Sequence, residues 1–363
     1  MRVRLRRRSL GMLSVMVAVA ALLPACGGDE ELTPVTFALT NQRAIQYAPY
    51  YIADYVGYYE DEGLDVEIVI VSGSSATVQQ VVSGNADIGH PSGPAVAQAV
   101  SQGNCLKQFY TDGYANVFGL ATPESTGIQS LADLKGSTVG ISEPGGGEVP
   151  LVRAILAGAG LAEGADYELL AIGEGGALTF QALSDGTAQA YSSSVFDVAA
   201  IEAAGLPLRQ LMPDEFKYFP STNMVVTCDY FDDNQDTLIK FARAVAKAQV
   251  WADANEQGAK DITRDVEPEL WEDEALAEAF WLATEDLNRP PADLAGAPNG
   301  TNYRAGWELY IQFASQGTEE EGALNAAAVD LDQLLTDELL DDINDFNADD
   351  VREDAANFAG VGG

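Results

Sequence analysis

The residues of this chain that could act on a small molecule follow predicted strands and form no compact catalytic cluster. In open α/β sheets, ligands bind beyond the carboxyl ends of the strands. Such positions hold amides, hydroxyls, glycines, carboxylates and one imidazole: Asn41, Gln42, Tyr47, Ser74, Ser75, His90, Ser92, Gly146, Gly147, Glu148, Glu174, Ser193 and Asn223. These residue types predict a ligand held by hydrogen bonds in loops.

The candidates in the first half of the chain each have a second explanation. Asn41, Gln42 and Tyr47 could bracket a polar, planar ligand, and turn or cap chemistry would account for them equally well. Ser74 and Ser75 stand at the start of a predicted helix, so we expect one of them to cap it whether or not it touches a ligand. These positions therefore predict a binding wall without defining the ligand.

The candidates in the second half combine a glycine-rich loop with carboxylates. The segment "EPGGGEVP", residues 143–150, lacks the lysine of a phosphate-binding loop, so we interpret it as backbone that approaches a ligand closely. Glu148, Glu174 and Asp197 could accept hydrogen bonds from ligand amines. The alternative is that these carboxylates are simply exposed on the surface.

The sequence contains few of the residue types and motifs that catalysis or metal binding requires. His90 is the single histidine, which leaves no zinc signature and no serine triad, and the chain lacks a G-x-S-x-G nucleophile elbow. Cys105 and Cys228 are far apart and form no C-x-x-C motif, so they are either a disulfide or two separate thiols. The sequence therefore predicts no enzyme, no cofactor and no metal.

The elements that would position these loops begin with a strand, helix, strand unit. Residues 35–40 alternate as a strand, and Tyr51, Tyr55 and Tyr59 then share one apolar stripe of a helix. Gly63 stands where a left-handed residue would end that helix, before a second strand begins. Because consecutive parallel strands need such a crossover helix, the unit predicts a parallel sheet.

The same alternation repeats twice along the chain, which predicts an α/β protein with two lobes. Further strands and helices are expected at 74–85, 86–90, 94–103, 106–113, 116–122, 130–142, 150–161, 167–173, 176–186 and 188–194. A β-rich run at 221–231 follows, and then the chain changes to long helices.

The first 25 residues have the pattern of an export signal. Arginines at positions 2, 4 and 6–8 precede an apolar run that ends in "LPAC", as in a secretory signal peptide with its cleavage site. Cys26 follows a small alanine, as in the lipobox of bacterial lipoproteins, and residues 26–33 would form a short tether. We expect an exported protein anchored by a lipid on Cys26; the alternative is a signal peptide that is not lipidated.

The charge of the mature chain restricts its partners. Five of the 19 Lys and Arg lie in the leader and none of the 56 Asp and Glu, which leaves 14 against 56, a formal net charge of −42. Such an acidic surface repels phosphate backbones, so nucleic-acid binding is excluded.

Several motifs, taken in order, carry a family resemblance. The segments "APYYIADYVGYYEDEGLDVEIVIVSGSS", "VVSGNADIGH", "SLADLKGSTVGIS" and "TDELLDDIN" resemble the substrate-binding proteins of ABC importers. The similar group serves nitrate, sulfonate and taurine uptake and includes binders of the thiamine pyrimidine precursor. The resemblance covers nearly all of residues 34–345.

The resemblance implies a two-lobed periplasmic binding protein fold of the second type, with a mainly parallel sheet in each lobe. The chain would cross between lobes twice and close on its ligand by hinge motion. Lobe 1 would comprise 34–121 and 224–363, and lobe 2 would comprise 122–223. This topology would put Cys105 and the strand containing Cys228 in one lobe, which favours the disulfide. The implied partners of the monomer are a small ligand and an ABC permease with its ATPase.

The ligand class is inferred from the candidate loops. Arg43 is the only cation in them, whereas carboxylates, aromatics and amides dominate. A small anion would benefit from a nearby cation. We therefore favour a pyrimidine-like or flavin-like heterocycle over sulfonate, taurine or nitrate. Two readings of another class stay open on this fold: a pyrimidine-synthesising enzyme and a sensory surface lipoprotein.

Overall fold

The computed structural model describes residues 32–40, 45–315 and 324–362, and Leu32–Gly363 forms one compact unit. Cys26, Asn41, Gln42 and Arg43 lie outside the described residues, as does the signal peptide. Within the described part, none of the helices combines the length and the apolar character needed to span a bilayer.

The first sheet has five strands in the order β2-β1-β3-β10-β4. β1 pairs in parallel with β2 and β3, whereas β10 is antiparallel to β3 and β4. The strands are β1 (Thr33–Thr40), β2 (Leu64–Val71), β3 (Ile88–His90), β4 (Leu106–Tyr110) and β10 (Met224–Thr227). Its early helices are α1 (Ala48–Val56), α2 (Tyr58–Asp61), α3 (Ser74–Val82) and α4 (Gly93–Ser101).

The tyrosine-rich helix predicted after β1 is broken into α1 and α2. Gly57 adopts a left-handed conformation with φ 90°, which ends α1 after Val56. Tyr59 is buried and stacks on Phe241 with ring centroids 5.3 Å apart, whereas Tyr51 and Tyr55 are half-buried against the core. The tyrosines therefore build the core, as predicted, but the single continuous helix was wrong.

The second sheet has the order β7-β6-β8-β5-β9 and repeats the mixed pattern. β6 is parallel to β7 and β8, and β5 is antiparallel to β8 and β9. The strands are β5 (Phe118–Pro123), β6 (Ser137–Ile141), β7 (Tyr167–Ala171), β8 (Ala190–Ser194) and β9 (Leu208–Gln210). Its helices are α5 (Glu148–Gly158), α6 (Ala177–Ser184) and α7 (Val195–Ala203).

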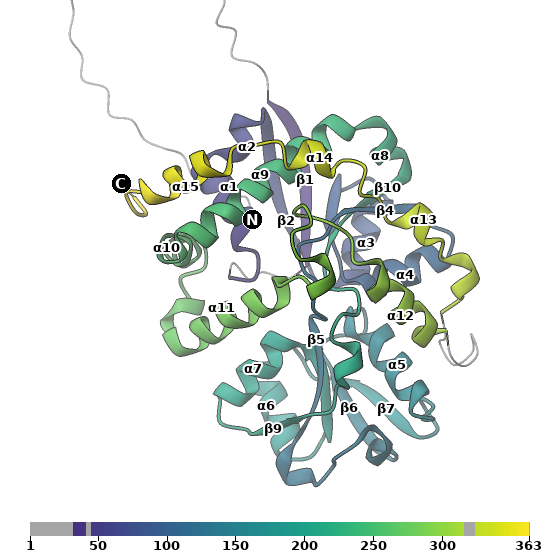
Figure 1. Ribbon diagram of the computed structural model, residues 1–363. Coiled ribbons are helices and arrows are strands. Elements are labelled where there is room, and N and C mark those ends of the chain that lie inside the picture. The colour runs from purple at the N-terminus through teal and green to yellow at the C-terminus, as the bar shows by residue number, and fades with distance from the viewer. Residues whose placement is uncertain (1–31, 41–44, 316–323, 363) are drawn as a thin grey trace, which may run out of the picture. The chain divides into compact units, whose positions relative to one another are not determined.

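Two mixed sheets flanked by helices confirm the predicted fold class (Figure 1). The chain passes from the first sheet to the second between Tyr110 and Phe118, and it returns between Gln210 and Met224. The strand that follows each crossing, β5 and then β10, is antiparallel to its neighbours. The lobe boundaries near residues 121 and 223 stay a prediction.

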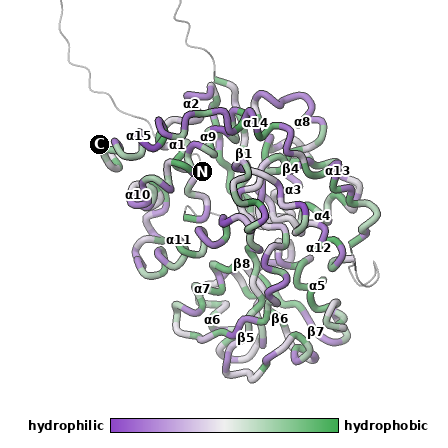
Figure 2. Tube along the Cα trace, in the orientation of Figure 1, coloured by the Kyte–Doolittle hydropathy of each residue, from purple (hydrophilic) through white to green (hydrophobic). Residues whose placement is uncertain are grey.

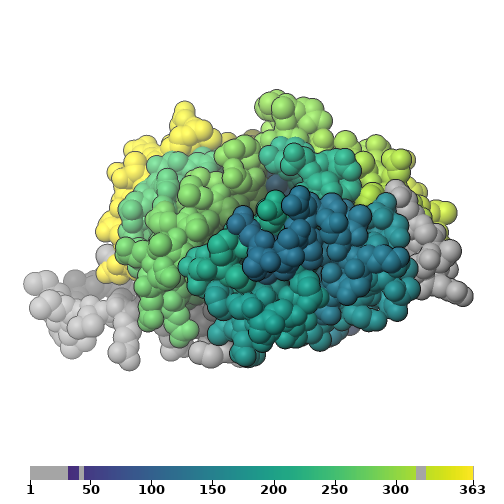
Figure 3. All heavy atoms as spheres, turned by 90° about the horizontal axis from the view of Figure 1, so that it is seen from below, coloured from purple at the N-terminus to yellow at the C-terminus, as the bar shows by residue number. Residues whose placement is uncertain are grey.

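The C-terminal helices contact both sheet regions. α9 packs on α1 and α15, whereas α11 packs on α7 and α12 on α5 of the second-sheet region. Figure 3 shows the green C-terminal segment lying against the teal second-sheet segment, and Figure 2 shows hydrophilic stretches on α8 and α10. The main helices are α8 (Cys228–Asp233), α9 (Gln235–Ala254), α10 (Glu256–Val266), α11 (Glu274–Asn288), α12 (Arg304–Ala314), α13 (Leu331–Leu334), α14 (Leu340–Ile343) and α15 (Ala348–Ala356).

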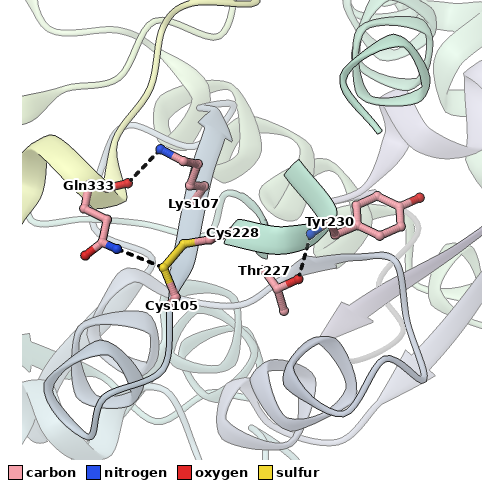
Figure 4. The surroundings of a disulfide bond; sticks show 6 residues. All are labelled: Cys105, Lys107, Thr227, Cys228, Tyr230 and Gln333. Atoms are coloured by element: carbon pink, nitrogen blue, oxygen red, sulfur yellow. Dashed lines mark hydrogen bonds between the residues drawn. A yellow bond between two sulfur atoms is a disulfide. The ribbon is translucent and has the colours of Figure 1, made fainter. Parts of the chain in front are cut away.

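Cys105 and Cys228 form a disulfide with Cα atoms 5.5 Å apart (Figure 4). Cys228 was expected within a strand; it is instead the first residue of α8, because Thr227 ends β10 and its Oγ accepts from the Tyr230 N–H at 3.2 Å. The Gln333 amide donates to Cys105 Sγ at 2.9 Å. The disulfide therefore links the start of β4 to the element that follows β10.

Candidate functional site

A pocket lies between the two sheets where their strands end. It encloses about 480 Å³, including space open to solvent. The lining residues described are Thr40, Gln46, Tyr47, Gly73, Ser74, Val117, Phe118, Ser142, Glu143, Gly146, Gly147, Glu148, Glu174, Ser193, Ser194, Asp197 and Thr222.

Seven of the predicted site residues line this pocket: Tyr47, Ser74, Gly146, Gly147, Glu148, Glu174 and Ser193. Ser75, His90, Ser92 and Asn223 are not among its lining residues. Their ligand contacts stay predictions, as do those of Asn41 and Gln42, which lie outside the described residues.

The first-sheet wall is built on α1 and α3. The Tyr47 hydroxyl donates to the Thr40 carbonyl at 2.5 Å, which ties the start of α1 to the end of β1. The predicted cap of α3 was wrong, because Gly73 occupies the N-cap with φ 81° and no side chain caps the helix. Ser74 instead is buried, and its Oγ accepts from the Ser92 N–H at 3.2 Å.

Glu148 is the most deeply buried acid on the second-sheet wall, with 2% of its surface exposed. Its Oε1 accepts from the Ser142 N–H at 2.8 Å and from Ser142 Oγ at 2.5 Å. Burial raises the pKa of the Glu148 carboxyl to about 7; the Ser142 hydrogen bonds oppose this shift and the charge of Asp197 adds to it. The carboxyl therefore titrates near neutral pH.

Asp197 is buried beside Glu148 at the start of α7. Ser193 Oγ and Ser194 Oγ each donate to Asp197 Oδ2 at 2.7 Å, and Ser194 caps the helix by accepting from the Asp197 N–H at 3.1 Å. Exposed surface positions were the alternative for these carboxylates; that description fits Glu174 and does not fit Asp197 or Glu148.

Glu143 is a pocket residue that sequence reasoning passed over. Its Oε2 accepts from Ser72 Oγ at 3.0 Å, across the gap between the two sheets. Its Oε1 is buried and has no hydrogen-bond partner among the residues that the structure describes. A buried carboxylate oxygen without a partner is costly, so this atom is a candidate acceptor for a donor from a bound molecule.

The loops of the two sheets meet closely around the pocket. The Ser75 N–H donates to the Gly145 carbonyl at 3.4 Å. A Cβ atom on Gly147 would overlap Ser92 Oγ and lie 2.7 Å from Ser74 Oγ. Glycine is therefore required at position 147 for the sheets to approach this far.

His90 does not line the pocket, but its ring contacts the ring of the lining residue Tyr47. Its Nε2 hydrogen-bonds Asp112 Oδ1 at 2.9 Å, and the Tyr50 hydroxyl donates to the same carboxylate. The Tyr47 ring, which does line the pocket, meets the His90 ring edge-on with centroids 5.5 Å apart. Burial, and then the Asp112 charge, raises the pKa of Tyr50 well above its usual value. His90 thus supports the residue that faces the ligand space.

The side chains that line the pocket offer mainly hydrogen-bond acceptors. Four lining residues carry carboxylates, and the lining residues described include no Lys or Arg. No group of three or more His, Cys, Asp and Glu in the described part of the chain is arranged to hold a metal ion. Such a site suits a ligand that brings its own N–H or O–H donors.

Comparisons with known proteins identify the family of the chain. A family model described as NMT1/THI5 like matches residues 44–259. A riboflavin-binding protein of Chloroflexus aurantiacus, RibY, is 23% identical over 337 residues, which cover 81% of this chain and 95% of the relative.

Solved structures share the fold. A protein of Bordetella bronchiseptica RB50 superposes with a TM-score of 0.71 and 25% identity, over 86% of this chain and 98% of that chain. The periplasmic nitrate-binding protein NrtA of Synechocystis PCC 6803 superposes with a TM-score of 0.62 and 16% identity. This match covers 88% of this chain and 91% of that chain. The fold is therefore that of periplasmic binding proteins, as the sequence motifs predicted.

Proposed function

Because the chain belongs to the NMT1/THI5-like family of substrate-binding proteins, we propose that it captures a nitrogenous heterocycle, flavin-like or pyrimidine-like, and delivers it to an ABC permease. The protein is a binding receptor of an import system and not an enzyme. The ligand class, a heterocycle, and the two partners, a permease and its ATPase, belong to the proposal.

The buried, unpartnered Oε1 of Glu143 is the observation that carries this proposal. Together with Glu148 it offers carboxylate oxygens to a ligand that carries ring N–H groups or hydroxyls. Tyr47 and Phe118 add aromatic surface to the same pocket. The riboflavin-binding relative supports a flavin-like ligand.

A small anion such as nitrate or a sulfonate is the second candidate. Ser74 begins α3, and Gly147 precedes α5, so two helix N-termini border the pocket. The fold shared with the nitrate-binding protein supports this candidate. The four carboxylates of the lining oppose it, since they would repel an anion.

Calorimetric titration with riboflavin, a pyrimidine, taurine and nitrate tests the proposal. We expect only the heterocycles to bind, without turnover, and Glu143→Gln to weaken their affinity about tenfold, the loss of one charge-assisted hydrogen bond. Ser72→Ala is the matched control, because it removes the partner of Glu143 Oε2 and leaves Oε1 in place. Binding of the anions alone would refute the heterocycle and leave the receptor function standing.

The proposed location is the cell surface or the periplasm, with the exported protein anchored at a membrane. The periplasmic nitrate-binding protein with the same fold supports export. The lipid anchor on Cys26 lies outside the described residues and rests on the leader sequence alone.

A further inference from the structure

A second cavity lies where the chain crosses between the sheets. It is lined by parts of segments 111–114 and 218–223, from the first and second crossings, together with Gln108, Tyr303 and Trp307. Its volume is about 210 Å³, including open space. We call it the crossing cavity; it shares no lining residue with the ligand pocket.

Three oxygen atoms of the lining residues lack a hydrogen-bond partner among the described residues. They are Gln108 Oε1, Ser221 Oγ and Asn223 Oδ1. Gln108 and Ser221 are each 1% exposed, and Asn223 is 3% exposed. Buried polar atoms are normally paired, and these three orphan oxygens belong to residues that line one cavity.

The orientation of the Gln108 amide is determined by its neighbours. Its Nε2 donates to Asn302 Oδ1 at 2.7 Å and to Thr111 Oγ1 at 3.0 Å. Asn302 is oriented in turn, because its Nδ2 donates to Asp337 Oδ1 at 2.7 Å. Turning the Gln108 amide would place two acceptor oxygens together, so Oε1 is the atom left without a partner.

Acidic groups and aromatic rings surround the crossing cavity, and one cation, Lys217, lies over the ring of the lining residue Tyr218, 5.4 Å from its centroid. Burial, and then the charges of Asp112 and Asp337, raise the pKa of the Tyr114 hydroxyl. Tyr114, Tyr303 and Trp307 contribute rings to the lining, and the described lining holds no Lys or Arg. Negative potential and ring faces both attract cations.

We propose that the crossing cavity binds a monovalent cation of the size of potassium or ammonium, held by Gln108 Oε1, Ser221 Oγ and Asn223 Oδ1. Neutral carbonyl and hydroxyl oxygens are ligands that potassium accepts in place of its hydration shell. Ammonium has a similar size and offers four donors. Ordered water is the competing occupant, because it could satisfy the same oxygens without any charge.

Thermal unfolding at constant ionic strength tests the proposal without any transport ligand. The purified mature chain is compared in potassium, ammonium, sodium and N-methyl-D-glucamine chloride. We expect potassium, ammonium or both to raise the midpoint by roughly 4–8 °C over N-methyl-D-glucamine at about a hundredfold excess over the dissociation constant. Equal midpoints in all four salts, or no preference over sodium, would mean water only and would overturn the proposal.

Two variants test the location of the cation. Ser221→Ala removes an orphan oxygen, so its midpoint in N-methyl-D-glucamine should hold or rise, whereas at least half of the cation-dependent rise should vanish. Gly113→Ala should also reduce the cation-dependent rise, because its Cβ would stand 3.0 Å from Ser221 Oγ. Tyr59→Phe is the matched control: it also removes a buried, unpartnered hydroxyl, on α2, and should keep the full rise. A full rise in Ser221→Ala would contradict the site.

Discussion

Glu148 and Ser142 are joined by two hydrogen bonds to one oxygen: Oε1 of Glu148 accepts from the Ser142 N–H at 2.8 Å and from its hydroxyl at 2.5 Å. This pairing anchors the start of α5 to the end of β6, beside the ligand pocket. It favours the charged carboxylate, yet burial outweighs it and raises the pKa to about 7.

The first prediction concerns the pH dependence of stability through Glu148. Its pKa is raised from 4.5 to about 7 on folding, so the folded state binds the proton more tightly. The stabilising contribution is complete below about pH 4.5 and is lost as the pH rises through about 7, a change of roughly 3 kcal/mol. Urea unfolding between pH 5 and 8 should show this loss in the wild type and not in Glu148→Gln.

The comparison with Glu148→Gln isolates this group from the rest of the acidic chain. General charge repulsion also grows with pH, and it affects both proteins equally. Glutamine keeps an oxygen that can accept from Ser142, so the site retains its hydrogen bonds. Parallel stability curves for the two proteins would show that Glu148 titrates as an ordinary surface acid.

The second prediction concerns the disulfide. Cys105 and Cys228 are 123 positions apart, and closing so long a loop restricts the unfolded chain by about 4–5 kcal/mol. The double variant Cys105→Ser/Cys228→Ser should lose most of this free energy of unfolding in urea. Gln333→Ala, which removes only the amide contact to Cys105 Sγ, should change it by about 0.5 kcal/mol or less. A double variant as stable as the oxidised protein would refute the assignment.

The third prediction separates support from ligand contact at His90. His90→Phe keeps an aromatic ring beside Tyr47 but removes the hydrogen bond to Asp112, whose side chain is 11% exposed. We expect the free energy of unfolding to fall by about 2–3 kcal/mol. Ligand affinity should fall by less than about threefold. Adding Asp112→Asn should recover part of the stability, because the buried charge is then gone. A tenfold loss of affinity with unchanged stability would indicate direct ligand contact.

The fourth prediction concerns the lipid anchor expected on Cys26. Cys26→Ser should move the expressed protein from the membrane fraction into the soluble exported fraction, because a lipid chain is the only anchor that the leader predicts. Ala25→Gly keeps a small residue before the cysteine and should stay with the membrane. Equal fractionation of both variants would speak against lipidation.

Local patterns were sufficient to predict the strand, helix alternation and much of the pocket. Ser74, Gly147 and Glu148 were found because they follow strands whose periodicity is clear. Asp197 carried an additional signal that was underused: Ser194 precedes it by three positions, the spacing of a capping pair. Gly57 likewise marked the break between α1 and α2, since an interior glycine weakens a helix.

Other features depend on contacts between distant segments and leave no local trace. The Oε1 atom of Glu143 is buried because Ser72 and Gly73 of the first-sheet region lie against this side chain. The orphan oxygens of Gln108 and Asn223 share a cavity only because two crossings run side by side. No periodicity or turn signal encodes contacts of this kind, so the sequence gives no indication that Glu143 is enclosed or that Gln108 and Asn223 line one cavity.

The fifth prediction tests whether the approach of the sheets at Gly147 is needed for binding. Gly147 has φ −67°, which alanine also adopts, so Gly147→Ala adds no backbone strain. Its Cβ would, however, overlap Ser92 Oγ and stand 2.7 Å from Ser74 Oγ, both from the first-sheet region. We expect ligand affinity to fall about tenfold or more, because the sheets must separate to relieve the overlap with Ser74 and Ser92. The Phe118 ring must shift as well, because its Cζ would stand 2.7 Å from the added Cβ and Phe118 belongs to β5 of the second sheet.

The same loop offers a matched control for this substitution. At Gly145 the nearest atom to an added Cβ would be the Ser75 Cβ at 4.0 Å, which is ordinary contact, so Gly145→Ala should bind like the wild type. Calorimetry gives the affinities, and small-angle scattering with saturating ligand should show Gly147→Ala remaining more extended than Gly145→Ala. If both variants bind equally tightly and become equally compact, contact of Gly147 with Ser74 and Ser92 is not a condition of ligand capture.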